Sequence, residues 1–146
     1  MSTSAIGTVL DAIRAALILR AGLSGVNVFS GVVSLEEAGL ECLAYDGGLL
    51  AEDSSSMGGN KLEVWDIDGE IRVFKPWAGD TELTIKAARD RALAIFAELE
   101  THLNDTYAGN MPDVEVIRGE IAGAYNPEGR ICNLTFTMKI QALKNP

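Results

Sequence analysis

The chain has 146 residues, of which 47% are hydrophobic and 23% are charged, so a single domain spanning residues 1–146 can bury a substantial core. Its 12 basic and 21 acidic residues give a formal net charge of −9, which argues against a general nucleic-acid binder. Asp11 and Arg14 interrupt the first apolar stretch, so we expect no signal peptide. The charge-free run Ala21–Leu35 is too short and too polar to span a bilayer, so we expect a protein that stays in the cytosol where it is made.

The N-terminal segment predicts an amphipathic helix. Ser4 can cap its start, and Gly22 is placed to end it. Its apolar residues recur at the spacing of one helical face: Ile6, Val9, Leu10, Ile13, Ala16 and Leu17. Residues 25–34 favour a short strand and a turn, because their valines and phenylalanine are interrupted by Ser30-Gly31. A second strand is predicted at Leu40–Tyr45.

Residues Asp46–Asn60 predict a long exposed loop, because they contain four glycines and three consecutive serines. Three apolar residues of this segment, Leu49, Leu50 and Met57, sit among polar neighbours that would not bury them within the domain. We interpret them as candidate contacts with a neighbouring subunit or another protein. A mobile surface loop with a few tucked-in side chains explains the composition equally well.

The segment Lys61–Phe74 predicts a hairpin of two antiparallel strands, because Asp68-Gly69 lies between two runs of alternating apolar residues. Pro76 can stop the second strand, and Asp80 or Thr81 can cap the helix that follows. Asp66, Asp68 and Glu70 resemble part of a calcium-binding loop, but the match ends after these three carboxylates. Solvent-facing hairpin residues are the simpler interpretation.

The central segment predicts a long helix with one apolar stripe, made of Ile85, Ala88, Ala92, Ile95, Phe96, Leu99 and Leu103. Val114–Tyr125 predicts a strand that Gly119 and Gly123 allow to bend or bulge. In Arg130–Ala142 every second residue is apolar: Cys132, Leu134, Phe136, Met138, Ile140 and Ala142. The predicted fold class is α+β, a mostly antiparallel sheet with an N-terminal helix and a long central helix packed on one face.

The residues that could carry chemistry do not form a recognisable motif. Cys42 and Cys132 are predicted to be reduced, packed thiols, and His102 is predicted to be a solvated or capping residue at the end of the central helix. Nucleotide-binding and metalloprotease motifs are absent from the sequence. The aromatic residues Tyr45, Trp65, Phe74, Trp77 and Tyr125 fit core or subunit anchors better than a ligand-binding set. We therefore predict no enzyme, no cofactor and no metal site.

The run AARDRALAIFAELETHL, followed by a polar break and a strand pair closed by Asn126-Pro127-Glu128-Gly129, resembles the tail terminator (tail completion) proteins of phages with long non-contractile tails. The resemblance rests on the order, length and pattern of the elements. It implies a homohexameric ring in the neck of the virion that binds the last ring of the tail tube protein and stops polymerisation. It also implies a surface for the head-tail connector or head-completion protein, and a channel through which DNA passes without specific binding.

Two other interpretations stay open. Another neck or tail-tube ring component, such as a head-closure protein or the tube protein itself, also combines a small α+β domain with long loops. A small ligand-binding or hydrolytic domain would instead be a monomer or dimer with a defined apolar pocket and perturbed carboxylates.

Overall fold

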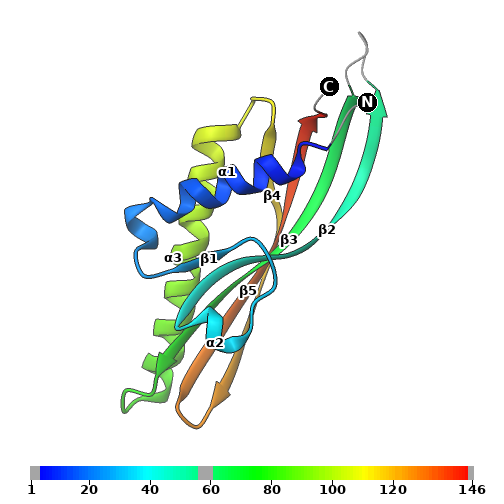
Figure 1. The fold of residues 1–146 in the computed structure, drawn as a ribbon. Coiled ribbons are helices and arrows are strands. Elements are labelled where there is room, and N and C mark those ends of the chain that lie inside the picture. Colours follow the sequence, from blue (N-terminus) through cyan, green and yellow to red (C-terminus); the bar gives the residue numbers. More distant parts are fainter. Residues whose placement is uncertain (1–3, 56–60, 145–146) are drawn as a thin grey trace.

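The computed structural model describes residues 4–55 and 61–144. Figure 1 shows one twisted sheet with the order β1-β2-β3-β5-β4, in which β1 runs parallel to β2 and all other neighbours are antiparallel. The two longer helices, α1 and α3, cover one face and share one hydrophobic core with it, which confirms the predicted α+β class. The elements are α1 (Ile6–Ile18), a 3-10 turn η1 (Ala21–Leu23), β1 (Asn27–Phe29), α2 (Leu35–Ala38), β2 (Glu41–Ser55), β3 (Lys61–Pro76), α3 (Thr81–Tyr107), β4 (Asp113–Asn126) and β5 (Gly129–Leu143).

The first helix, α1, begins beside a buried carboxylate. Glu63, which is 1% exposed, accepts hydrogen bonds from the Ser4 hydroxyl at 2.9 Å and from the Ala5 backbone N–H at 2.7 Å. A carboxylate at this position also faces the positive end of the helix dipole. Ala5, and not Ser4, is the N-cap residue, and the helix ends before Gly22, which lies in η1. The predicted helix therefore exists, and the Ser4 hydroxyl accepts a hydrogen bond from the Ile6 N–H at 3.2 Å, but Ser4 is not the N-cap residue and Gly22 does not end the helix.

The predicted loop at 46–60 is wrong over its first ten residues, because Asp46–Ser55 continue β2. Residues 56–60, including Met57, lie outside the described residues. The strand tolerates Gly47 and Gly48 because its backbone stays paired with β3 at these positions. The register shifts between Tyr45 and Gly47, and again between Leu50 and Glu52, which indicates two bulges.

The predicted hairpin at Asp68-Gly69 is also wrong, because β3 runs straight through these residues. Gly69 is needed for packing and not for a turn. A Cβ atom on Gly69 would lie 2.7 Å from Cε2 of Phe136, closer still to its Cζ, and 3.0 Å from the carbonyl oxygen of Ala44. The aromatic ring thus fills the space beside the glycine, a close approach that only a residue without a side chain permits.

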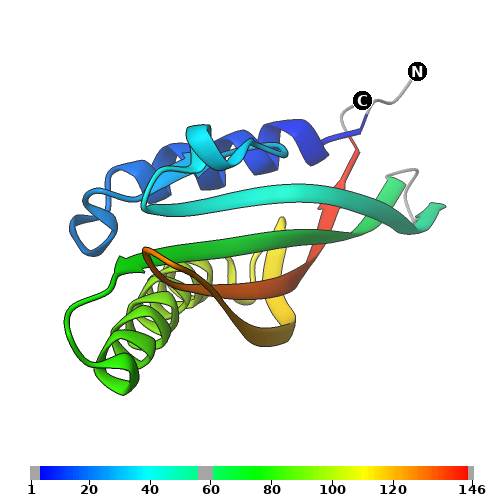
Figure 2. The same cartoon turned by 90° about the horizontal axis from the view of Figure 1, so that it is seen from below.

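The second half of the chain follows the prediction closely. The side chain of Asp80 accepts a hydrogen bond from the Leu83 N–H at 2.9 Å and caps α3. The predicted stripe of α3 is buried at Ala88, Ala92, Ile95, Leu99 and Leu103, whereas Ile85 is 38% exposed and Phe96 is half-buried. All six alternating apolar residues of β5 are buried. Figure 2 shows the resulting arrangement, with α1 lying along the β1–β2 side of the twisted sheet and α3 along β3, β5 and β4.

Candidate assembly surfaces

The two predicted interface leucines lie on the part of β2 that has a strand on only one side. β1 pairs with Cys42–Ala44 alone, so within the described residues the stretch Asp46–Leu50 hydrogen-bonds only to β3. Leu49 is 67% exposed and Leu50 is 38% exposed. An unpaired edge with exposed leucines is a surface on which another strand can add. The structure therefore places Leu49 and Leu50 on a strand edge and not in a loop.

The opposite edge of the sheet carries an apolar groove that sequence analysis did not single out. The groove has a volume of about 370 Å³ and lies between the first half of α3 and the β4–β5 hairpin. Ile85 and Ala88 of α3 form one wall, while Ile121 and Tyr125 of β4 form the other. Ile121 is 45% exposed and Tyr125 is 76% exposed. In the sequence this wall is visible as two large apolar residues, Ile121 and Tyr125, on either side of Gly123. Gly123 has no side chain, so the groove stays open between them.

Two guanidinium groups, Arg89 and Arg130, border this groove. Arg130 lies over the ring of Tyr125 at 5.3 Å from its centroid and donates a hydrogen bond to the Gly129 carbonyl at 3.0 Å. No carboxylate of the described residues forms an ion pair with Arg130, and Arg89 pairs there only with the exposed side chain of Asp90, at 3.4 Å. In a chain with a net charge of −9, this apolar surface with a basic rim is a local exception.

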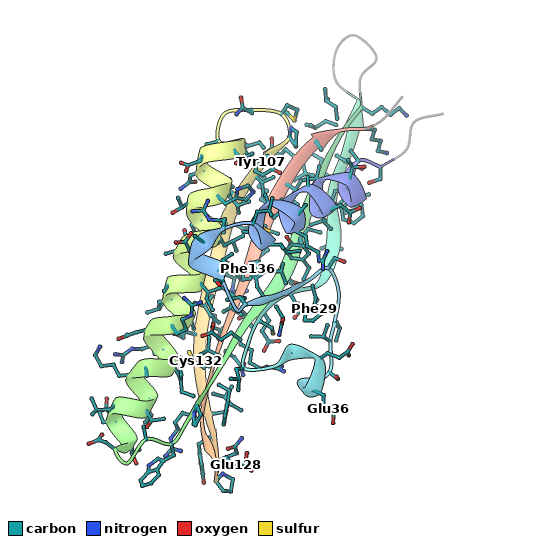
Figure 3. All side chains as sticks on the ribbon, turned by 60° about the vertical axis from the view of Figure 1, so that its left-hand side comes forward. Phe29, Glu36, Tyr107, Glu128, Cys132 and Phe136 are labelled. Carbon is teal, nitrogen blue, oxygen red and sulfur yellow. The ribbon has the colours of Figure 1, made fainter. Side chains whose placement is uncertain are left out.

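The other edge carries a short acidic helix, α2, also missed from the sequence. Ser34 and Glu37 form a capping box, in which the Glu37 carboxylate accepts from the Ser34 N–H at 3.0 Å and the Glu37 N–H donates to the Ser34 hydroxyl. The backbone hydrogen bond from Ser34 holds the pKa of Glu37 below its usual value. The three-residue spacing of Ser34 and Glu37 is the sequence pattern that predicts this capping box. Glu36, marked in Figure 3, is exposed and makes no hydrogen bond or ion pair with any described residue.

The face of the sheet that α1 and α3 do not cover is polar. Asp66, Asp68 and Glu70 follow one another along β3 on this face, and Asp68 accepts a hydrogen bond from the Thr137 hydroxyl at 2.7 Å. Burial, and then the charges of Glu70 and Asp68, raise the pKa of Asp46 nearby. The three carboxylates of β3 thus lie along a straight strand and not around a turn. Among the described residues, no three potential ligand side chains are close enough together to hold a metal ion.

His102 is buried, contrary to the prediction that it is solvated. It is 8% exposed and packs edge-on against Tyr107, with 5.9 Å between ring centroids. Its Nδ1 lies 3.3 Å from the Thr106 hydroxyl, and its Nε2 has no hydrogen-bond partner among the described residues. Burial, with a further effect of the Arg20 charge, lowers the pKa of His102.

The two cysteines do not meet the histidine. Both thiols are free and buried, as predicted, and burial raises both of their pKa values. Cys132 belongs to the core on the helix-covered face, whereas Cys42 pairs in register with Arg72 on the opposite face of the sheet. A thiol with a raised pKa and no adjacent base is a poor nucleophile. No Cys-His pair is assembled within the described residues.

The predicted aromatic residues do not gather at one site. Tyr45 is 2% exposed in the core, Trp65 and Phe74 are half-buried, and Trp77 and Tyr125 are mainly exposed. Trp77 precedes α3, and its backbone N–H donates to the Glu128 carbonyl at 2.9 Å, which ties this connection to the tip of the β4–β5 hairpin. These residues therefore serve as separate core or surface elements and not as one ligand-binding set.

The fold is similar to that of a known virion chain. One matching chain comes from the virion of a native gene transfer agent particle, with a TM-score of 0.63 and 16% sequence identity, and the match covers 95% of this chain and 98% of that chain. At this identity the likeness shows the fold alone. No family model matches the sequence, and no curated protein matches it. Among the described residues, no helix is long and apolar enough to cross a membrane.

Proposed function

We propose that this chain is a structural protein of a tailed virion and acts as a tail terminator. Copies of the chain form a ring, which binds the end of the tail tube, stops its polymerisation and presents a surface to the head-side connector. The observation that carries this proposal is the shared fold with a chain of a virion particle over nearly the full length of both chains. The order of the elements from α3 to the final hairpin, which resembles tail terminators, supports it independently.

The two edges of the sheet suit a ring. A closed ring needs two different, complementary surfaces on each subunit, because each copy contacts its two neighbours through unlike patches. The exposed edge of β2 with Leu49 lies at one side of the sheet, and β4 with Ile121 lies at the other. A subunit with two such edges can bind one neighbouring copy at each edge.

The electrostatics suit a channel through which DNA passes without specific binding. The net charge is −9 per chain, and every added copy increases the negative charge of the assembly. A negative channel repels phosphate backbones instead of retaining them. Assembly would occur in the host cytoplasm, and the finished ring would stay in the neck of the virion.

The test is recruitment to tube ends. Purified chain is added to growing tail tubes of the same particle, and tube lengths and ends are recorded by negative-stain electron microscopy. The proposal predicts an extra ring of density at one end of each tube and tubes that stop growing. Tubes that grow unchanged and carry no cap would refute the terminator role. Spontaneous tubes of this chain alone would identify it as the tube protein instead.

A further inference from the structure

The α2 segment and the apolar groove lie at the same level on opposite edges of the sheet. The register forms one row across the sheet: Glu41 pairs with Val73, Val73 with Cys132, and Cys132 with Gly123. Glu41 follows α2 almost directly in the chain, while Cys132 and Gly123 line the groove. Figure 3 shows the consequence, with Glu36 of α2 on one side of the sheet and Cys132 beside α3 on the other.

Both surfaces expose apolar side chains that the isolated subunit leaves uncovered. On the α2 side, Val32 is 79% exposed and Leu40 is 62% exposed. On the groove side, Ile121 and Tyr125 are exposed, and the groove of about 370 Å³ can receive several side chains. Apolar surface of this kind on both edges of a chain indicates contact with other protein.

The charges at the two surfaces are opposite. Arg130 and Arg89 border the groove, and Arg130 has no carboxylate partner among the described residues. Glu36 and Glu37 lie on α2, and Glu36 has no partner among the described residues. Opposite charges around an apolar contact select the partner and fix its orientation. The acidic α2 thus complements the basic rim of the groove.

We infer that α2 and its flanking apolar residues from one copy dock into the α3–β4 groove of the next copy. This inference rests on the proposed ring and names the contact that closes it. The contact joins unlike surfaces, so it continues from subunit to subunit. Both surfaces lie on one row of the sheet, so they stand at about the same height along the strands, as subunits that contact one another around a ring require.

Single charge reversals test this contact. Glu36→Arg places a basic group against the basic groove rim, and Arg130→Glu places an acidic group against the acidic α2. Each is expected to weaken assembly at least about tenfold, because like charges brought together at an interface cost more than the roughly 1.4 kcal/mol that a tenfold change represents. Glu100→Arg, an exposed reversal on α3 about three turns from the groove, is the matched control and should assemble normally. Circular dichroism checks that all variants fold.

Mixing the two variants gives the sharper test. In a mixture, the arginine introduced by Glu36→Arg in one chain faces the glutamate introduced by Arg130→Glu in the other, and the native Glu36 and Arg130 face each other at the next contact. The mixture should therefore assemble where neither variant does alone, with the two chains alternating in equal amounts. Native mass spectrometry with one chain isotopically labelled measures that composition.

The outcomes separate this inference from the proposed function. Rings that form normally from Glu36→Arg or Arg130→Glu would overturn the docking contact and leave the ring itself intact. Failure of the mixture to assemble, with both variants folded, would also overturn it. A wild-type chain that forms no ring would overturn both. A two-chain particle restored by mixing would show that the surfaces meet in a closed dimer, which contradicts the ring contact.

Discussion

The packing of Phe136 over Gly69 makes a quantitative prediction about the middle of the sheet. Replacing Gly69 by Ala would place a methyl group 2.7 Å from Cε2 of Phe136 and 3.0 Å from the Ala44 carbonyl oxygen. Phe136 cannot move freely, because it is 2% exposed and its ring lies 6.1 Å from that of Phe96. Overpacking of this kind costs about 1–3 kcal/mol, against a gain of roughly 0.5–1 kcal/mol for replacing glycine within a strand.

We therefore expect Gly69→Ala to lower the free energy of unfolding by about 1–2 kcal/mol. Phe136→Ala alone should lower it by roughly 3–5 kcal/mol, because it removes a large buried side chain. In the double variant the added methyl group meets no ring and only the Ala44 carbonyl oxygen at 3.0 Å, so Gly69→Ala should cost little there. The coupling between the two substitutions should then be at least about 1 kcal/mol.

Urea unfolding followed by tryptophan fluorescence, at one protein concentration for all variants, measures these differences. If Phe136→Ala does not fold, Phe136→Leu serves in its place. An equal cost of Gly69→Ala in both backgrounds would refute the reasoning, because the glycine would then be needed for its backbone and not for the ring. A Phe136→Ala variant of normal stability would show that the buried face of β5 is assigned wrongly.

Three further predictions concern the first helix, the β2 edge and pH. Glu63→Ala should lower the free energy of unfolding by about 1–3 kcal/mol, because it leaves the buried backbone N–H of Ala5 at the start of α1 unpaired. Glu63→Gln keeps a hydrogen-bond acceptor, so it should lower the free energy of unfolding by less in the same urea measurement. Replacing Leu49 and Leu50 with Asp should weaken assembly, measured by light scattering, without changing the circular dichroism spectrum. Replacing the exposed Leu93 of α3 with Asp is the control and should leave assembly unchanged. If both changes affect assembly equally, the β2 edge is not part of the interface. The pKa of His102 is lower in the folded chain than its ordinary value of 6.5, so the unfolded chain takes up a proton at a higher pH than the folded chain does. The contribution of His102 to stability is therefore fully present above pH 6.5 and is lost as the pH falls below 6.5. His102→Gln should flatten that part of the stability profile, and an unchanged slope would contradict the assignment.

The elements that could be predicted are those whose side chains repeat with a period. The stripe from Ala88 to Leu103 and the alternation from Cys132 to Ala142 both place one face in the core, as their spacing predicts. The errors arise where local composition and tertiary structure disagree. Asp68-Gly69 is a strong local signal for a turn, but the glycine is required by the ring of Phe136, which is distant in the chain. Only the folded sheet brings the two together.

The candidate surfaces could be predicted only in part. The polar neighbours of Leu49 and Leu50 predict that these residues lie outside the core, yet their location on a strand edge depends on where β1 stops pairing. The groove between Ile85 and Ile121 joins a helix and a strand that are far apart in sequence. The complementary surface around Glu36 can be paired with the groove only once the strand register shows that both lie on one row. Sequence patterns identify faces of elements, whereas the pairing of faces is a property of the fold.

The most direct measurement of the central claim is the mass of the purified wild-type chain by light scattering after size exclusion. A ring predicts one concentration-independent particle, and a hexamer would have about six times the 15.6 kDa of one chain. A monomer that persists at high concentration and does not bind tube ends would contradict the ring and, with it, the terminator function.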